Sequence, residues 1–283
     1  MKTILVPLSG AASDRSSLEL ASRVARVFSS HINVVHVQRN IVEQVATMTM
    51  GAGAISQEVW DTLAAESRSR ETNARKQLDE LCSKEGFALL MEPSFGAPTA
   101  SWQSFDGVLK NTLIRLGRFC DLLVVGREAP LYGLDIDSLG EILLQCGRPM
   151  LIASSERREL LCESVAIAWK DTAQSAHALT AAQPFLAKAK KVFVLQVQEE
   201  PSADFSAQEL VRQLRWGNCD AELHSLKPTQ GGTTRALVTA ALSLDVDLLV
   251  AGGYGHSRAR EFILGGVTRE LLEDCPLPVL MTH

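Results

Sequence analysis

The chain has 283 residues, enough for two compact domains or for one large one. Hydrophobic residues make up 46% of it and charged residues 22%, a globular composition that excludes a mainly disordered chain. The formal net charge is −5 and only 5% of the residues are aromatic, which argues against nucleic acid or an anionic membrane as the main partner.

The first elements are a strand, a helix and a second strand. Residues 2–7 form an apolar run of strand length, and Ser9-Gly10-Ala11 follows as a small polar cluster. Residues 31–37 read as the next strand. Between them lies a helical pattern whose apolar face comprises Leu18, Ala21, Val24, Ala25 and Phe28.

The sequence shows neither a secretion signal nor a membrane span. Met1-Lys2-Thr3 runs directly into the first strand, without a charged region followed by a long apolar region. No apolar stretch approaches the roughly 20 residues needed to cross a bilayer. We therefore expect a soluble, cytoplasmic protein.

Extra sequence follows in the first half, at about residues 41–70. It contains Met48, Met50 and the glycine-containing run 51–53. Residues 55–81 look helical, and residues 64–76 are heavily charged and expected to be solvated. A methionine-rich lid or partner surface is one interpretation; a mobile loop followed by a long amphipathic helix is the other.

The second half repeats the first. A strand pattern at 164–169 is followed by the polar cluster 170–172, a helix and a strand at 191–197. Pro184 should kink this helix near its end. Its apolar face is predicted to comprise Ala176, Leu179, Ala182 and Leu186.

The ends of the two halves also correspond. Residues 120–126 mirror 246–252, and each half finishes with a proline-led strand, at 149–152 and 278–281. The polar run 154–159 reads as a linker. The repeat predicts two domains, 1–154 and 160–283.

Alternation of strands and helices indicates βαβ units. The near-continuous apolar strands fit a mainly parallel sheet that is buried on both faces. The predicted fold is α/β, with two tandem open-sheet domains, each a mainly parallel sheet of about five strands flanked by helices. Right-handed crossovers place the carboxyl ends of the strands at one edge, where such folds bind ligands.

A glycine-rich segment at residues 252–268 follows the last mirrored strand and leads into a helical pattern. Glycines at such a position let backbone N–H groups approach an anion, and the helix N-terminus adds partial positive charge. His256, Arg258 and Arg260 could supply further positive charge. The structural alternative is that the glycines form tight turns and the arginines are solvated.

This segment resembles the universal stress protein family, whose nucleotide-binding members carry G-x2-G-x9-G followed by Ser or Thr. Gly252, Gly255 and Gly265 fall in register, and residues 274–280 are similar to the family's final strand. Gly266 stands where Ser or Thr is expected, and Thr268 is a possible replacement.

The resemblance implies a Rossmann-like domain of the adenine nucleotide alpha hydrolase type that binds ATP or AMP, with Mg, in the second copy. The family's first strand ends in an Asp that meets adenosine; Lys170 takes this place in copy two and Ser9 in copy one. Trp169 would stack on a base or pack against a helix. The candidate nucleotide-binding residues are Trp169, Lys170, Gly252, Gly253, Gly255, His256, Gly265, Gly266, Val267 and Thr268.

The first copy lacks this motif. It has no glycine at the family's second position, and Asp137-Ser138 replaces the Gly-Ser pair. Glu128, Asp135 and Asp137 would repel phosphate. We interpret the first copy as a degenerate, structural half.

The resemblance also implies that the two copies pair through their last strands as an intramolecular pseudo-dimer, since an apolar final strand needs cover. A further homodimer of the whole chain is plausible; protein partners are not identified.

Three functions remain open. The first is a stress-response protein that binds an adenine nucleotide in the second copy. The second is a family member that has lost nucleotide binding, has no cofactor, and acts through protein partners or another small ligand. The third is an ATP-using enzyme, an interpretation that only the loop at Ser9-Gly10 supports. No catalytic residue or metal site stands out. The six cysteines read as free thiols, with no pattern that assigns them a redox role.

Overall fold

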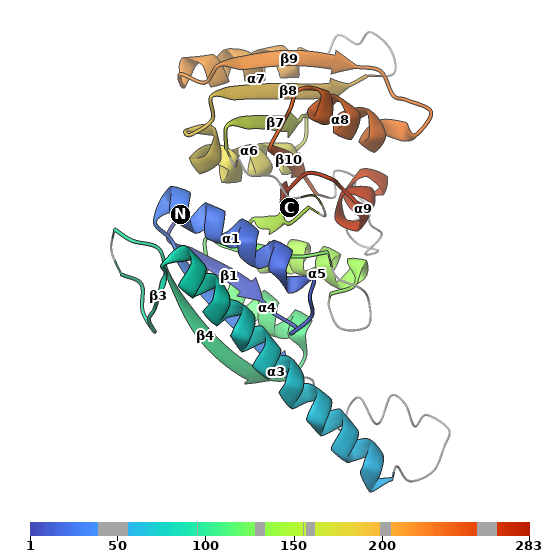
Figure 1. Ribbon diagram of the computed structural model, residues 1–283. Coiled ribbons are helices and arrows are strands. Elements are labelled where there is room, and N and C mark those ends of the chain that lie inside the picture. Colours follow the sequence, from blue (N-terminus) through green and yellow to red (C-terminus); the bar gives the residue numbers. More distant parts are fainter. Residues whose placement is uncertain are drawn as a thin grey trace. The chain divides into compact units, whose positions relative to one another are not determined.

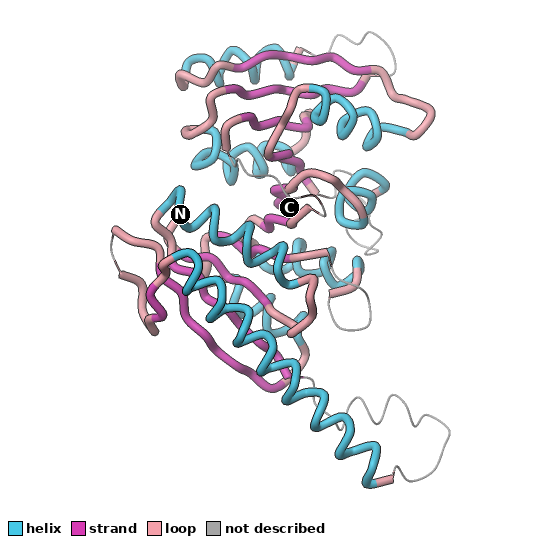
Figure 2. The backbone as a smooth tube through the Cα atoms, in the orientation of Figure 1, coloured by secondary structure: helices cyan, strands magenta, loops and turns pink. Residues whose placement is uncertain are grey.

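Strands and helices alternate along nearly the whole chain (Figures 1 and 2). The computed structural model describes residues 1–38, 56–94, 96–127, 134–154, 156, 162–198, 205–253 and 265–283. By their internal contacts these residues divide into two compact units, Met1–Asp135 and Ile136–His283. The prediction of an α/β fold with mainly parallel sheets is confirmed.

The first unit contains a parallel sheet in the order β3-β4-β2-β1-β5. Figure 1 shows α1 and α3 in front of this sheet and α4 behind it. Its elements are β1 (Thr3–Pro7), α1 (Asp14–Phe28), β2 (His31–Gln38), α3 (Gln57–Glu85), β3 (Ala88–Leu89), β4 (Thr99–Asp106), α4 (Leu109–Gly117) and β5 (Leu122–Val125).

Helix α1 covers the sheet with the face that the sequence predicts. Leu18, Ala21, Val24 and Ala25 are buried, and Phe28 at the end of the helix is half-buried. Since these positions recur with the helical period, one side of α1 can join the core while Arg26 stays exposed.

The predicted long helix is α3, which ends where Gly86 adopts a left-handed conformation with φ of 71°. Its inner side buries Ala74, Leu78 and Leu81, whereas most of its first half is exposed, as expected for the charged stretch. Figure 1 shows this first half extending past the end of β4. Met48, Met50 and residues 51–53 lie outside the described residues, so their interpretation as a lid or a loop stays a prediction.

The second unit contains a sheet in the order β6-β11-β10-β7-β8-β9. All its neighbouring strands are parallel except β6 and β11. Its elements are α5 (Ile136–Cys146), β6 (Met150–Ile152), β7 (Ser164–Ala168), α6 (Ala173–Leu186), β8 (Lys191–Val197), α7 (Ser206–Trp216), β9 (Ala221–Leu226), α8 (Gly232–Ser243), β10 (Leu248–Gly252), α9 (Gly266–Glu273) and β11 (Val279–Thr282).

The final strands of the two sequence repeats pair with one another, as the resemblance implies. β6 and β11 are antiparallel, with Leu151 opposite Leu280 at the centre of the pair. Both strands are buried along their whole length. Helix α5 contacts α9 and β11, so α5 and β6 belong to the second unit by contacts although the repeat assigns them to the first copy. The domain boundaries drawn from the repeat stay a prediction.

Helix α6 differs from its predicted apolar face only at its start. Ala182 and Leu186 are buried as predicted and Leu179 is half-buried. Ala176 was expected in the apolar face but is exposed, and Ser175 and Ala178 are buried in its place. The reason is a close approach between α6 and β10: a Cβ atom at Gly252 would lie 2.7 Å from the backbone nitrogen of Ser175. The helix therefore turns its Ser175 side toward the strand. Pro184 lies within the last turn of α6.

Each copy has an aspartate that accepts hydrogen bonds from backbone N–H groups near the start of the copy's first strand. Asp247 precedes β10 and accepts hydrogen bonds from the backbone N–H groups of Cys162, Glu163 and Ser164, at 3.0, 2.8 and 3.2 Å. Asp121 precedes β5 and accepts from the N–H groups at the start of β1. Burial raises the pKa of Asp247, and these N–H groups counteract that shift. The sequence repeat thus extends to individual hydrogen bonds.

A buried polar cluster joins β2 and β4. The ring nitrogens of His31 lie 2.7 Å from Thr99 Oγ1 and 3.0 Å from Ser101 Oγ, and the Ser101 hydroxyl donates to Asn33 Oδ1 at 2.7 Å. His31, Thr99 and Ser101 are each 2% exposed. Burial lowers the pKa of His31 below its ordinary value of 6.5.

This shift predicts a loss of stability in mild acid. Between the lowered folded pKa of His31 and the unfolded value of 6.5, the unfolded chain binds the proton more readily. The stabilising contribution is therefore present above pH 6.5 and declines as the pH falls from 6.5 toward the folded pKa. Urea unfolding midpoints at pH 7.5 and 5.5 should differ less for His31→Gln than for the original chain. His177→Gln, at an exposed position, should leave the difference unchanged; equal behaviour of the two variants would contradict the prediction.

Candidate functional site

The candidate site lies where the strand order of the second sheet changes direction. From β7 the chain moves outward through β8 and β9 and then returns to β10 on the other side of β7. β7 and β10 are parallel neighbours, with Ala168 opposite Ala251. Ligands of open α/β sheets bind outside the carboxyl ends of the strands at such a switch point. Trp169 and Lys170 follow β7, and Gly252 ends β10 with Gly253 after it; all four are among the residues that the sequence predicts for the site.

Trp169 is half-buried and is held by two hydrogen bonds. Its backbone N–H donates to Leu195 O at 2.9 Å, and its indole N–H donates to Ser206 Oγ at 3.0 Å, at the start of α7. The indole is thus oriented by α7, which fits the packing interpretation and leaves part of the ring exposed. Lys170 is exposed.

Gly252 is required by packing, because a Cβ atom there would lie 2.7 Å from backbone atoms of Gln174 and Ser175. A Cβ atom at Gly253 would lie 2.7 Å from Leu143 Cδ2, the end of a side chain that can move aside. The N–H of Gly253 donates to Thr282 O at 2.7 Å. Packing thus explains Gly252 whether or not a ligand binds.

Gly265 and Gly266 lie in different surroundings. Apart from the immediate chain neighbours, no heavy atom of the described residues would lie within 4 Å of a Cβ atom at either position. Gly265 caps α9 with φ of −62° and ψ of 147° and supplies no side-chain hydrogen bond. The first helical bond runs from Arg269 N to Gly265 O, at 2.9 Å. The N–H groups of Gly266 and Val267 precede it, at the helix end that attracts anions.

Thr268 is buried, whereas Gly266 is exposed. That Thr268 replaces the family's hydroxyl therefore stays a prediction. Gly255 and His256, with Arg258 and Arg260, lie outside the described residues.

In the first unit, the loop after β1 corresponds to the loop after β7. It binds the carboxylate of Asp14, a residue of the same chain. Asp14 is fully buried, and its Oδ2 accepts hydrogen bonds from the N–H groups of Ser9 and Gly10 at 2.9 and 2.7 Å. Its Oδ1 accepts from the Ser9 hydroxyl at 3.1 Å. The N–H groups that a phosphate would need are thus already paired with a negative charge.

Helix α3 closes the same loop from outside. Gly10 has φ of 85°, and a Cβ atom there would lie 2.3 Å from Arg70 O. The Gln77 side chain donates to Ala11 O at 2.9 Å. Asp14 stands in the first helical turn, where acidic residues are common. Its pairing with the loop was missed because it depends on the loop conformation that turns the N–H groups of Ser9 and Gly10 toward it.

The cavity at the carboxyl ends of β1 and β5 is also small. It measures about 10 Å³, room for about one water molecule, against the roughly 300–1,000 Å³ of small-molecule sites. Its lining residues are Pro7, Leu8, Ser9, Leu109, Val125, Gly126 and Leu134. This cavity is therefore too small for a nucleotide.

Among the described residues, few side chains are arranged for metal binding or catalysis. These residues hold no cluster of three His, Cys, Asp or Glu side chains suited to a metal ion. His36 is buried in β2 and its Nδ1 lies 2.8 Å from Leu8 O, which fits its interpretation as a core residue. In the same part of the chain, no helix is long and apolar enough to cross a membrane.

Two of the cysteines, Cys82 and Cys162, are poorly suited to redox chemistry. All six cysteines are free, and every one except Cys219 is buried. Burial raises the pKa of Cys82 to about 11 and that of Cys162 to about 12. Since the thiolate is the reactive form, these two thiols are inert near neutral pH.

Comparison with known proteins agrees with this fold. Residues 222–283 match the model of the universal stress protein family. No curated protein matches the chain. A universal stress protein from Archaeoglobus fulgidus DSM 4304 superposes with a TM-score of 0.71 at 13% identity, covering 99% of this chain and 95% of that one. A putative universal stress protein from Pseudomonas aeruginosa UCBPP-PA14 gives 0.58 at 18% identity, over 100% and 93% of the two chains.

A universal stress protein solved in complex with cAMP covers only 55% of this chain, with a TM-score of 0.37, 14% identity and 98% of its own length. The full-length matches at low identity show the fold alone, and the family model matches the C-terminal region. This chain thus has the fold of these universal stress proteins over its whole length, and its residues 222–283 match the universal stress protein family.

Proposed function

We propose that this chain is a stress-response protein that binds ATP or another adenine nucleotide in its second unit, at the carboxyl ends of β7 and β10. The observation that carries the proposal is the contrast between the two copies. Among the described residues, the backbone at the start of α9 is open around Gly265 and Gly266, whereas in the first unit the loop after β1 is filled by Asp14 and the cavity at the carboxyl ends of β1 and β5 measures only about 10 Å³.

The proposed binding residues would contact different parts of the nucleotide. N–H groups of Gly266 and Val267 would meet phosphate oxygens, because they precede the first hydrogen bond of α9. Trp169 and Lys170 stand at the end of β7, beside Gly252 and Gly253. The half-exposed indole would contact the base, and the lysine ammonium would add positive charge near phosphate. Mg would accompany a triphosphate as its counter-ion, bound through phosphate oxygens.

A second function rests on Lys170 and Gly266. These residues stand where the resemblance expects Asp and Ser or Thr, so two side chains that would hold a nucleotide are replaced. A family member without nucleotide binding would act through protein partners. The ATP-using enzyme is disfavoured, because its loop at Ser9-Gly10 is occupied by Asp14.

The test is to denature the purified protein, extract small molecules and identify them by mass spectrometry. We expect ATP, ADP or AMP in near-stoichiometric amounts. Calorimetric titration of the emptied protein with Mg-ATP, AMP and cAMP should then show one site per chain. A clean extract together with no binding of any of the three would overturn the proposal and favour the function through protein partners.

A further inference from the structure

Strand β4 has an outer edge that is only partly paired. It comprises eight residues, and its inner edge pairs with β2 along its whole length. On the outer edge, β3 pairs only with Thr99 and Ala100, after which the chain of β3 leaves. The rest of this edge has no strand beside it among the described residues.

Hydrogen bonds show which backbone groups point outward. Leu90 N–H donates to Ala100 O at 2.8 Å, so the polar groups of Ala100 face away from β2. Gly107 N–H points toward β2 instead, because it donates to Gln38 O at 3.0 Å. Because the direction alternates along a strand, the N–H and C=O groups that face outward beyond Ala100 are those of Trp102, Ser104 and Asp106. No described residue pairs with them.

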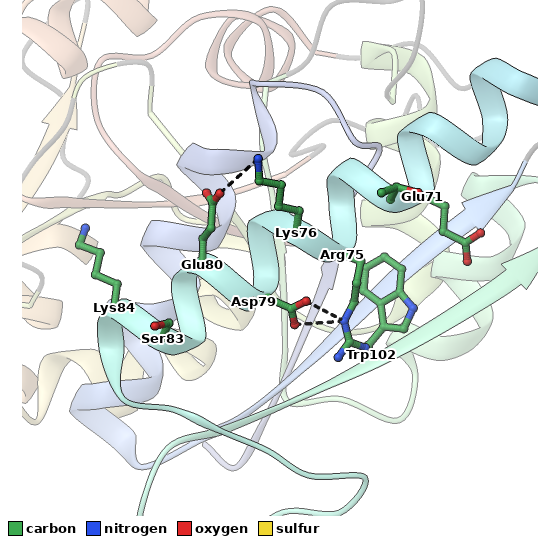
Figure 3. Close-up of a pocket in the computed structure, with 9 residues that line it drawn as sticks. Glu71, Arg75, Lys76, Asp79, Glu80, Ser83, Lys84 and Trp102 are labelled. Carbon is green, nitrogen blue, oxygen red and sulfur yellow. Dashed lines mark hydrogen bonds and ion pairs between the residues drawn. The ribbon is translucent and has the colours of Figure 1, made fainter.

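A groove accompanies this open edge (Figure 3). It measures about 1,030 Å³, and Trp102 lies in it under the outer flank of α3. The ring of Trp102 stacks on His36, with centroids 6.0 Å apart and the planes at 12°. The guanidinium of Arg75 lies 5.8 Å from its centroid. The groove is lined by Glu71, Thr72, Arg75, Lys76, Asp79, Glu80, Ser83, Lys84 and Trp102.

The charges along the groove are largely neutralised within α3. Arg75 pairs with Asp79 at 3.1 Å, and Lys76 pairs with Glu80 at 3.8 Å, each one turn apart (Figure 3). An occupant therefore meets little net charge. What this surface offers is a row of unpaired backbone groups and one aromatic side chain.

We infer that the open edge of β4 binds an extended peptide segment of a protein partner as an added strand, with uncharged, apolar side chains at alternate positions. The interface already formed on this edge favours that occupant, because Ala88–Leu89 is itself an extended segment running parallel to β4. A second copy related by two-fold symmetry would have to pair antiparallel instead. Alternate side chains of the peptide would enter the groove over Trp102.

Ser104→Pro tests this edge with little effect on the sheet. Proline removes only the outward N–H of residue 104, and prolines occur on edge strands with that side free. Ser104→Ala is the matched control, because it changes the same exposed side chain and keeps the N–H. The probe is a displayed library of random 10-residue peptides, selected on the original full-length chain.

We expect selected peptides with apolar residues at alternate positions. They should bind the original chain and Ser104→Ala with equal affinity. Their affinity for Ser104→Pro should be at least about tenfold lower, because the added strand loses a hydrogen bond and the proline ring keeps it from approaching β4. Hydrogen exchange on the original chain should show that the peptide protects the amides of Trp102, Ser104 and Asp106. This second measurement decides the question even if Ser104→Pro fails to fold.

Three results would overturn the inference. One is a library that yields no binder, and another is peptides that bind Ser104→Pro as well as they bind Ser104→Ala. The third is self-association of the original chain in sedimentation equilibrium that Ser104→Pro abolishes, which would assign the edge to a second copy.

Discussion

Gly265→Val is expected to lower the affinity for ATP by at least about tenfold while leaving the stability of the fold unchanged. A Cβ atom at this position meets no atom of the described residues within 4 Å, and φ of −62° with ψ of 147° suits valine. A bound ligand would therefore be obstructed more than the described part of the fold. The N–H groups at the start of α9 are each expected to donate to a charged phosphate, a bond worth about 1.5–3 kcal/mol, and about 1.4 kcal/mol is tenfold in affinity.

The measurement is calorimetric titration with Mg-ATP, together with urea unfolding of the same preparations. Gly252→Ala is the contrasting variant, because its Cβ would lie 2.7 Å from the backbone of Gln174 and Ser175. Forced contacts of this kind cost about 1–3 kcal/mol, so this variant should unfold at lower urea. Unchanged ATP affinity in Gly265→Val would show that the start of α9 is not the nucleotide site.

Asp14→Ala is expected to destabilise the first unit by about 2–4 kcal/mol. The carboxylate of Asp14 accepts from the N–H groups of Ser9 and Gly10 in a fully buried position, and each buried donor left without a partner costs about 1–3 kcal/mol. Asp14→Asn keeps one acceptor oxygen and should lose less. Hydrogen exchange should show the loss in β1 and α1.

Asp137→Ala provides the matched control. Asp137 also stands in the first turn of a helix, α5, but it is exposed. Its removal should change the urea midpoint by no more than an ordinary surface substitution, about 0.5 kcal/mol or less. If Asp14→Ala behaves like Asp137→Ala, the loop of the first unit does not depend on its internal carboxylate.

The two predictions concern two different loops at the carboxyl ends of the strands, one in each copy of the repeat. In the first unit the loop after β1 is closed by Asp14 within the chain, whereas in the second unit the loop after β7 contains Lys170 and, among the described residues, the start of α9 at Gly265 is open. A chain whose domains were duplicated can keep the fold in both copies and restrict a ligand to one of them. The nucleotide extract and the Gly265→Val titration together decide whether the second unit binds a nucleotide.

Much of the fold followed from local sequence patterns. The apolar run 191–197 predicted β8 with its observed bounds, and the face of α1 was predicted from Leu18, Ala21, Val24 and Ala25. Such elements are determined by hydrophobic periodicity, because burial of an apolar strand or stripe needs no knowledge of the partner that covers it. The mirrored Asp121 and Asp247 likewise showed that the two halves are built in the same way.

By itself, then, the sequence determined the α/β class, the tandem repeat and the family resemblance of the C-terminal region. Only the three-dimensional structure decided that Asp14 fills the first loop, that α6 turns Ser175 inward beside Gly252, and that β4 leaves an edge open. The Asp14 contacts are local but depend on the conformation of the loop before α1. The other two features depend on contacts between elements distant in the chain. Periodicity records which side of an element is apolar, but not which atoms of another element will meet it.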